Sequence, residues 1–463
     1  MRRAISTAIL MNLALGCAGA ASAEPKWIRV DTPNFIVVGT GGERRLANVG
    51  AQFEGFREAL TRLISKTAVS SPVPTVVIVF PDDRTFAPFK PTFQGKPVNV
   101  GGLYASQPHI NYILLGPAHG SEDDLRGVFH EYTHLVIANT SPGLPLWLNE
   151  GLAEYYSSFQ IDDDGRAVVL GRAIDAHLGV LARERWIPLP ELIATTQTSP
   201  EYNESARRSI FYAESWALVH MLLHSTPDRA AALGGYVDET LDGEPSPDAW
   251  AEAFGRGDLL TSLRQYVQRP VLASRRYVLP APIGATAASL VAFSDADRAA
   301  LFDGVMAALG RAPRGDSRHA RERARLEPSS NAGWFDDYMF AADLFANGVP
   351  AEPADRLAAL AALDRVLAKR GDLLHALYMC GILDDVTGRD PPRAVEYLRN
   401  VHRAVPARDD YSLAFAEALA RSGDFANAKA VVQNVIDHPH LDGVKPQAVG
   451  VLRAIVAAER QRR

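Results

Sequence analysis

The sequence predicts an α+β domain followed by an all-α domain of helical repeats, and three observations support this fold class. Short β-branched runs at 35–38, 75–80 and 110–115 are typical of buried strands. Segments with helical periodicity come after these strands, which is the order expected of an α+β domain. Beyond about residue 331 the chain is rich in Ala, Leu and Arg and is helical in pattern throughout, with a repeating period.

Composition bounds the class of protein. The 463 residues are 47% hydrophobic and 22% charged, which are globular values and enough for two or three domains. Lys and Arg number 48 against 54 Asp and Glu, so no broad basic surface is expected and nucleic acid is not an expected partner. The two cysteines, Cys17 and Cys380, exclude a disulfide scaffold.

Residues 1–23 have the pattern of a signal peptide. Arg2 and Arg3 form a positive start, residues 4–15 are mostly apolar, and Ala-Ser-Ala at 21–23 is an A-x-A cleavage signal. The apolar core is too short for a transmembrane helix, and no later stretch reaches 18 apolar residues. We therefore expect an exported protein without a transmembrane helix.

In a bacterium, export would lead to the periplasm or the medium. Lipid attachment at Cys17 is the less favoured alternative, because Leu15-Gly16-Cys17 resembles a lipoprotein cleavage site but Ala14 stands where leucine is usual.

Four segments are expected along the chain. They are the signal peptide at 1–23, the α+β domain at 24–245, a helix-rich connecting region at 246–330, and helical repeats at 331–463. The connecting region carries no recognisable functional pattern.

The repeats have a 34-residue period. Ala394 and Ala428 are 34 residues apart, and the pairs Leu398/Val432 and Val401/Val435 keep the same offset. Thirty-four is the tetratricopeptide period, and residues 421–439 resemble the second half of that repeat. Such repeats stack helix pairs and usually present a groove, so a protein partner is expected there. The alternative is an ordinary helical bundle with a coincidental period.

The chemistry of the chain is concentrated at His130-Glu131-Tyr132-Thr133-His134. We expect this run to lie in a helix that begins near Ser121 and ends near Asn139, which puts both imidazoles on one face. Neutral imidazole suits Zn²⁺, and Glu131, about 100° around the helix, can take a proton from a zinc-bound water. This H-E-x-x-H pattern is the metallopeptidase signature.

A catalytic zinc normally has a third protein ligand. After a Pro/Gly turn comes a second expected helix with the run WLNEGLAEY, whose glutamates are Glu150 and Glu154. An antiparallel helix pair would bring Glu150 toward the histidines, and Glu154 could then accept the other N–H of a ligating histidine. Spacing alone also allows the reverse assignment.

HEYTH followed by WLNEGLAEY resembles the gluzincin metallopeptidases, and in particular the peptidase MA-like group of exported bacterial proteins. The resemblance covers roughly 30–225 and implies a zincin-like metallopeptidase domain. In that pattern the glutamate of N-E-G is the third zinc ligand, here Glu150, and the acidic residue four positions later is Glu154. The exopeptidase motif G-x-M-E-N is absent from the sequence, so an endopeptidase is the expected activity.

Residues 209–220 resemble the helix that follows the zinc helices in MA-like proteins. A phenol there could donate a hydrogen bond to the oxyanion, and Tyr212 is the candidate. His220 and His224 are expected to be core or helix-end histidines, and His109 a surface loop histidine. The edge of the strand 110–115 is a candidate for pairing with an extended peptide.

The sequence thus predicts an exported zinc metallopeptidase acting on a peptide or protein substrate. The alternative is a binding or scaffold protein whose repeats carry the function, with an inactive or structural metallopeptidase domain. A zinc hydrolase acting on a cell-wall peptide or a non-peptide amide is a third possibility.

Overall fold

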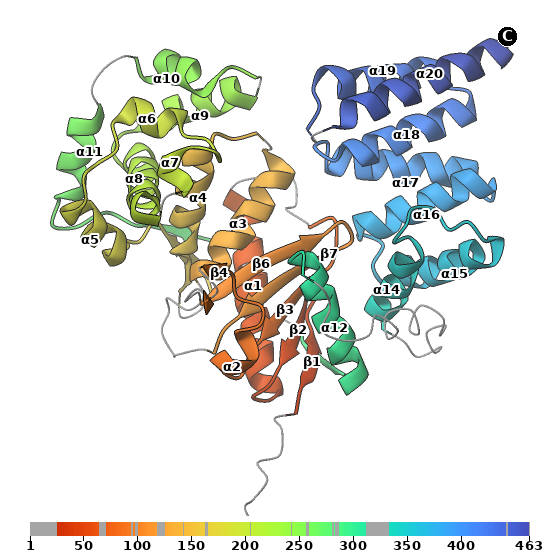
Figure 1. The fold of residues 1–463 in the computed structure, drawn as a ribbon, viewed down its shortest axis with the longest axis horizontal. Coiled ribbons are helices and arrows are strands. Elements are labelled where there is room, and N and C mark those ends of the chain that lie inside the picture. Colours follow the sequence, from red (N-terminus) through yellow and green to blue (C-terminus); the bar gives the residue numbers. More distant parts are fainter. Residues whose placement is uncertain are drawn as a thin grey trace, which may run out of the picture.

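The computed structural model describes most of the chain beyond residue 25. The described residues are 26–63, 71–93, 96–97, 101–117, 126–141, 143–162, 165–203, 205–241, 243–255, 259–279, 282, 287–311, 333–440 and 443–462. The expected signal peptide, Cys17 and the expected helix cap at Ser121 lie outside them. The fold is mixed α/β, with an N-terminal sheet and an all-helical C-terminal region (Figure 1).

The described strands form a six-stranded sheet in the order β11-β1-β2-β3-β7-β6. β2, β3 and β7 are parallel, and the other pairs are antiparallel. The three parallel strands are buried along their whole length, which explains their continuous apolar sequence. The strands are β1 (Ile28–Asp31), β2 (Phe35–Gly39), β3 (Thr75–Val79), β6 (Gly102–Gln107), β7 (Ile110–Leu115) and β11 (Ser289–Val291).

The prediction that an extended peptide could pair with the edge of the strand at 110–115 is wrong. β7 pairs with β3 on one side and with β6 on the other, so both of its edges are hydrogen-bonded. The strand at that end of the sheet is β6, which follows from the short turn between the two strands.

Helices cover both faces of the sheet. On one face lie α1 (Glu43–Leu63) and α3 (Arg126–Thr140), whose Phe53, Phe56 and Phe129 pack on the odd-numbered strand residues. On the other face lie α12 (Asp295–Ala308) and the short α2 (Asp83–Phe86). The helix that carries HEYTH is therefore anchored on the sheet by its apolar residues.

A second lobe of mainly helical structure surrounds α8, in which residues 213–222 are fully buried. A three-stranded sheet of β8 (Gln160–Ile161), β9 (Ala167–Leu170) and β10 (Arg275–Val278) belongs to this lobe, and β4 (Thr92–Phe93) and β5 (Lys96–Pro97) form a separate two-stranded sheet. The helices are α4 (Leu146–Ser157), α5 (Asp175–Arg183), α6 (Leu189–Ala194), α7 (Pro200–Asn203), α8 (Ser205–His224), α9 (Pro227–Leu241), α10 (Ser246–Phe254) and α11 (Leu259–Val267).

The region expected to be a connector, 246–330, contributes to both of these parts. β11 pairs with β1 at the edge of the main sheet, β10 pairs with β9, and α12 covers one sheet face. Packing is therefore continuous across the boundary expected at residue 245.

The C-terminal region is a row of antiparallel helices. α17 begins at Pro391 and α19 at Phe425, 34 residues later, and the periodic residues Ala394, Leu398, Ala428 and Val432 are all buried. The helices are α14 (Trp334–Leu344), α15 (Pro353–Lys369), α16 (Leu374–Thr387), α17 (Pro391–Ala404), α18 (Asp409–Ser422), α19 (Phe425–Asp437) and α20 (Val444–Arg462).

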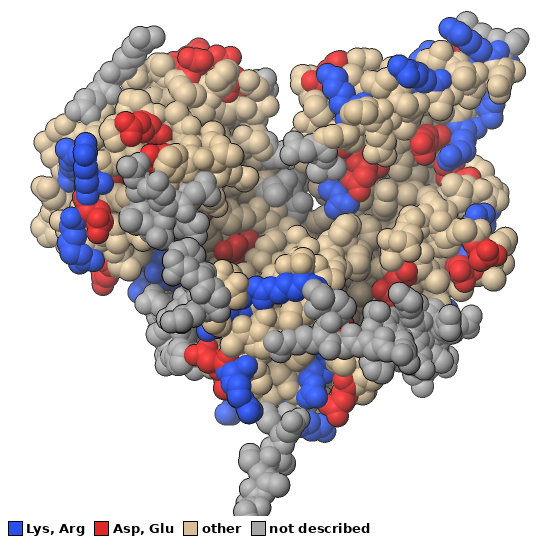
Figure 2. All heavy atoms as spheres, in the orientation of Figure 1, with Lys and Arg blue, Asp and Glu red and all other residues tan. Residues whose placement is uncertain are grey.

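The first helices of this region are attached to the end of the sheet. The hydroxyl of Tyr338 donates to the carbonyl of His109 at 2.6 Å, and the backbone N–H of His375 donates to the carbonyl of Pro72 at 2.9 Å. Figure 2 shows a cleft between the C-terminal helices and the α8 lobe. Charges of both signs are interspersed on this face. Among the helices in the described ranges, none is long and apolar enough to cross a membrane.

Candidate metal centre

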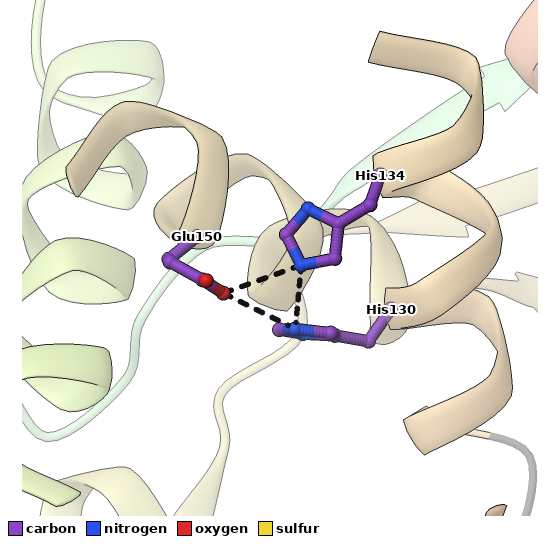
Figure 3. A group of neighbouring side chains, drawn as sticks. All are labelled: His130, His134 and Glu150. Atoms are coloured by element: carbon purple, nitrogen blue, oxygen red, sulfur yellow. Dashed lines mark hydrogen bonds and ion pairs between the residues drawn. The ribbon is translucent and has the colours of Figure 1, made fainter. Parts of the chain in front are cut away.

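Two helices bring three potential ligands together (Figure 3). His130 and His134 lie one turn apart on α3, and their Nε2 atoms are 3.0 Å from each other. Oε2 of Glu150, on α4, is 3.3 Å from each of these nitrogens. The ligand atoms of the three residues all lie within 4.8 Å of one another.

The arrangement fits a metal ion. Glu150 is buried, and its Oε2 has no hydrogen-bond donor among the described residues, which is costly for a buried carboxylate. Two imidazole nitrogens and one carboxylate oxygen are a donor set that Zn²⁺ accepts. The group could therefore hold a metal ion.

A glycine allows α4 to reach this position. A Cβ atom on Gly151 would lie 2.5 Å from the carbonyl oxygen of Ser215 on α8, so only glycine permits this close approach of α4 and α8. The glycine of the N-E-G run thus has a packing reason.

The other nitrogens of the two histidines face oxygen atoms of α4. Nδ1 of His134 lies 2.9 Å from Oδ1 of Asn149, and Nδ1 of His130 lies 3.5 Å from Oε1 of Glu154. Because an amide oxygen only accepts, the ring of His134 carries its proton on Nδ1 and leaves the lone pair of Nε2 facing the group. Glu150 and Glu154 thus occupy different sides of His130, with Glu150 on the Nε2 side.

Burial and neighbouring histidines act in opposite directions on the pKa of Glu150 and on that of Glu154. Burial opposes ionisation of Glu150, but the close contacts with His130 and His134 and their charge outweigh it and lower the pKa of Glu150 to about 2. Burial also opposes ionisation of Glu154. The contact with His177 is the largest of the effects that outweigh burial, and the pKa of Glu154 is lowered to about 2. Both side chains are therefore anionic at neutral pH.

Glu131 lies beside the ligand group on α3 and behaves differently. Burial raises the pKa of Glu131, and the two neighbouring histidines offset only part of that effect. A raised pKa brings a carboxylate closer to the range in which it exchanges protons near neutral pH.

Two tyrosines border the group, one expected and one not. The ring of Tyr212, on α8, lies 6.0 Å from the ring of His130. Tyr202, on α7, donates its hydroxyl to Oε1 of Glu150 at 3.3 Å, and its ring is 6.3 Å from that of Tyr212. Tyr202 is absent from the sequence-based predictions because it belongs to no motif and lies 52 residues from Glu150.

His220 and His224 have structural partners. Nε2 of His220 donates to the carbonyl of Gly171 at 2.8 Å, and Nδ1 pairs with the hydroxyl of Tyr266 at 2.6 Å. His224 lies 3.0 Å from the hydroxyl of Tyr155. His220 is buried and His224 is the last residue of α8, which agrees with the expectation of core or helix-end histidines.

Comparison with known proteins does not assign the chain to a family. No protein-family model matches it, and none of the curated proteins is significantly similar to it. The functional assignment therefore rests on the residues of the candidate centre and their geometry.

Proposed function

We propose that the chain is a zinc-dependent metallopeptidase, an exported endopeptidase with a zincin-like domain and tetratricopeptide-like C-terminal repeats. The observation that carries this proposal is the convergence of the Nε2 atoms of His130 and His134 on Oε2 of Glu150. The neighbouring Glu131, with its raised pKa, supports a hydrolytic function over a purely structural metal site.

His130, His134 and Glu150 would hold the zinc. When bound, zinc polarises a carbonyl group and lowers the pKa of water to about 7. Asn149 and Glu154 orient the two histidines through their Nδ1 atoms.

The residues of the chain would handle protons and charge. Glu131 takes a proton from the attacking water as its oxygen bonds to the scissile carbonyl carbon. Glu131 then returns this proton to the leaving amine as the C–N bond breaks. Tyr212 donates a hydrogen bond to the substrate oxyanion that develops in between.

The test uses the variant Glu131→Gln, which removes the base and leaves the three ligands in place. The wild-type protein should cleave members of a mixed peptide library, and the variant should keep its zinc while turnover falls by about 10²–10⁴. Glu417→Gln is the control, because it makes the same substitution on α18, outside the candidate centre.

Equal cleavage by the wild type and Glu131→Gln would overturn the proposed role of Glu131. A zinc-loaded wild type that cleaves no peptide in the library would favour the scaffold alternative, in which the C-terminal helices carry the function.

A further inference from the structure

The two oxygens of Glu154 face different partners. Oε1 lies 3.5 Å from Nδ1 of His130. Oε2 lies 3.1 Å from Nε2 of His177 and accepts a hydrogen bond of 3.1 Å from the guanidinium of Arg126. Glu154 thus connects a candidate metal ligand with a histidine that no sequence motif indicates.

His177 is itself fixed in place by neighbouring elements. It lies in the first turn of α5, its side chain is 13% exposed, and its ring is 5.6 Å from that of Trp216 on α8. The chain enters α5 through Gly171, which has a φ of +69° and lies so close to α4 that a Cβ would be 2.5 Å from the ring of Tyr155. The path of the backbone therefore sets His177 beside Glu154.

Arg126 and His177 hold the same oxygen from different directions. Arg126 belongs to α3, the helix that also carries His130, whereas His177 ties Glu154 to α5. A carboxylate with one oxygen held in this way loses rotational freedom, so the other oxygen stays directed at its own donor.

We propose that His177 is a positioning residue that acts on the metal centre through Glu154. By holding Oε2, His177 keeps Oε1 in place as the acceptor for the Nδ1–H of His130, and Nε2 of His130 then faces the metal position. This inference rests on the proposed metal site, and it adds a third layer of residues to that site.

The test is the zinc dissociation constant of the full chain, measured by competition with a chromophoric chelator. His177→Leu removes the imidazole that pairs with Oε2 and should weaken zinc binding about tenfold, the lower end of the range known for such supporting residues. His177→Gln places a polar N–H group beside Oε2 and should recover most of this loss. His402→Leu, a histidine on α17, is the matched control and should leave zinc binding unchanged.

A double-mutant cycle separates positioning from general destabilisation. In a Glu154→Ala background, His177→Leu should cause no further loss of zinc affinity, because the residue through which it acts is gone. The visible spectrum of the Co²⁺-substituted protein should change with His177→Leu and be close to that of the wild type with His177→Gln.

Unchanged zinc affinity in His177→Leu would overturn the proposal, as would an equal loss in the wild-type and Glu154→Ala backgrounds. If the leucine variant does not fold, His177→Gln provides the readout. A zinc affinity as low as that of Glu154→Ala, together with the same Co²⁺ spectrum as Glu154→Ala, would also contradict the proposal. A wild type that binds zinc but cleaves no peptide contradicts the proposed function alone.

Discussion

Oδ1 of Asn149 lies 2.9 Å from Nδ1 of His134, and the next residue in the chain is Glu150. One turn of α4 therefore supplies both a candidate ligand and the acceptor that fixes a second candidate ligand. Consecutive residues of a helix point about 100° apart, so these two side chains can reach opposite sides of the same imidazole. This explains why an asparagine directly before the glutamate is useful at this site.

Asn149→Ala should weaken zinc binding by about 10- to 100-fold, because His134 loses the acceptor that sets its tautomer. Asn149→Asp keeps an acceptor oxygen and should bind zinc more tightly than the alanine variant. Chelator competition measures both. Wild-type affinity in Asn149→Ala would show that the contact does not support the centre.

Tyr202 and Tyr212 should have separable effects. Tyr212→Phe removes the proposed oxyanion donor and should lower kcat by about 10²–10³ without loss of zinc, whereas Tyr202→Phe removes a donor to Glu150 and should weaken zinc binding. Steady-state kinetics and zinc affinity of both variants provide the test. The opposite pattern would assign the oxyanion role to Tyr202.

Glu214 should make the protein less stable as the pH rises. It is fully buried on α8, accepts a hydrogen bond from the backbone N–H of Ile187 at 2.7 Å, and burial raises its pKa from 4.5 to about 8. Between these pH values the folded state keeps a proton that the unfolded state releases. The stability that Glu214 contributes is therefore complete below pH 4.5 and is lost as the pH rises through 8.

Glu214→Gln preserves the acceptor and removes the titration. The free energy of unfolding of the wild type should therefore fall by on the order of 3 kcal/mol more than that of the variant between pH 5 and 8. Denaturant titrations at several pH values measure this difference. Parallel pH profiles for the two proteins would contradict the account.

The C-terminal helices should be needed for the fold of the sheet domain. Trp334 and Phe335 of α14 pack on the core that includes Trp27 and Phe80, and Arg29 pairs with Asp336 at 3.0 Å. A chain truncated before α14 would expose this apolar surface and should aggregate, as seen by size-exclusion chromatography. A folded, monomeric fragment truncated before α14 would contradict this prediction.

Local patterns predicted the elements but not all of their partners. The apolar runs at 35–38, 75–80 and 110–115 are strands because periodicity and β-branching are local signals. The pairing of β11 with β1 joins segments more than 250 residues apart, and a three-residue strand has no clear signature.

For the candidate centre, too, local patterns predicted some residues and not others. The spacing of His130 and His134 places both on one helix face, a consequence of helical geometry that the sequence contains. Choosing Glu150 over Glu154 as the third ligand required the family resemblance. The two glutamates lie one turn apart on the same helix, so spacing alone does not distinguish them. Tyr202 and His177 reach the centre only through the packing of α7 and α5, which no spacing reveals.

The most direct test of the metal centre is the zinc content of the purified, dialysed protein. We predict about one zinc per chain in the wild type and its loss in Glu150→Ala, whose two histidines alone should not retain the ion through dialysis. A wild type that holds no zinc even after reconstitution would contradict the central claim, as would full retention of zinc by Glu150→Ala.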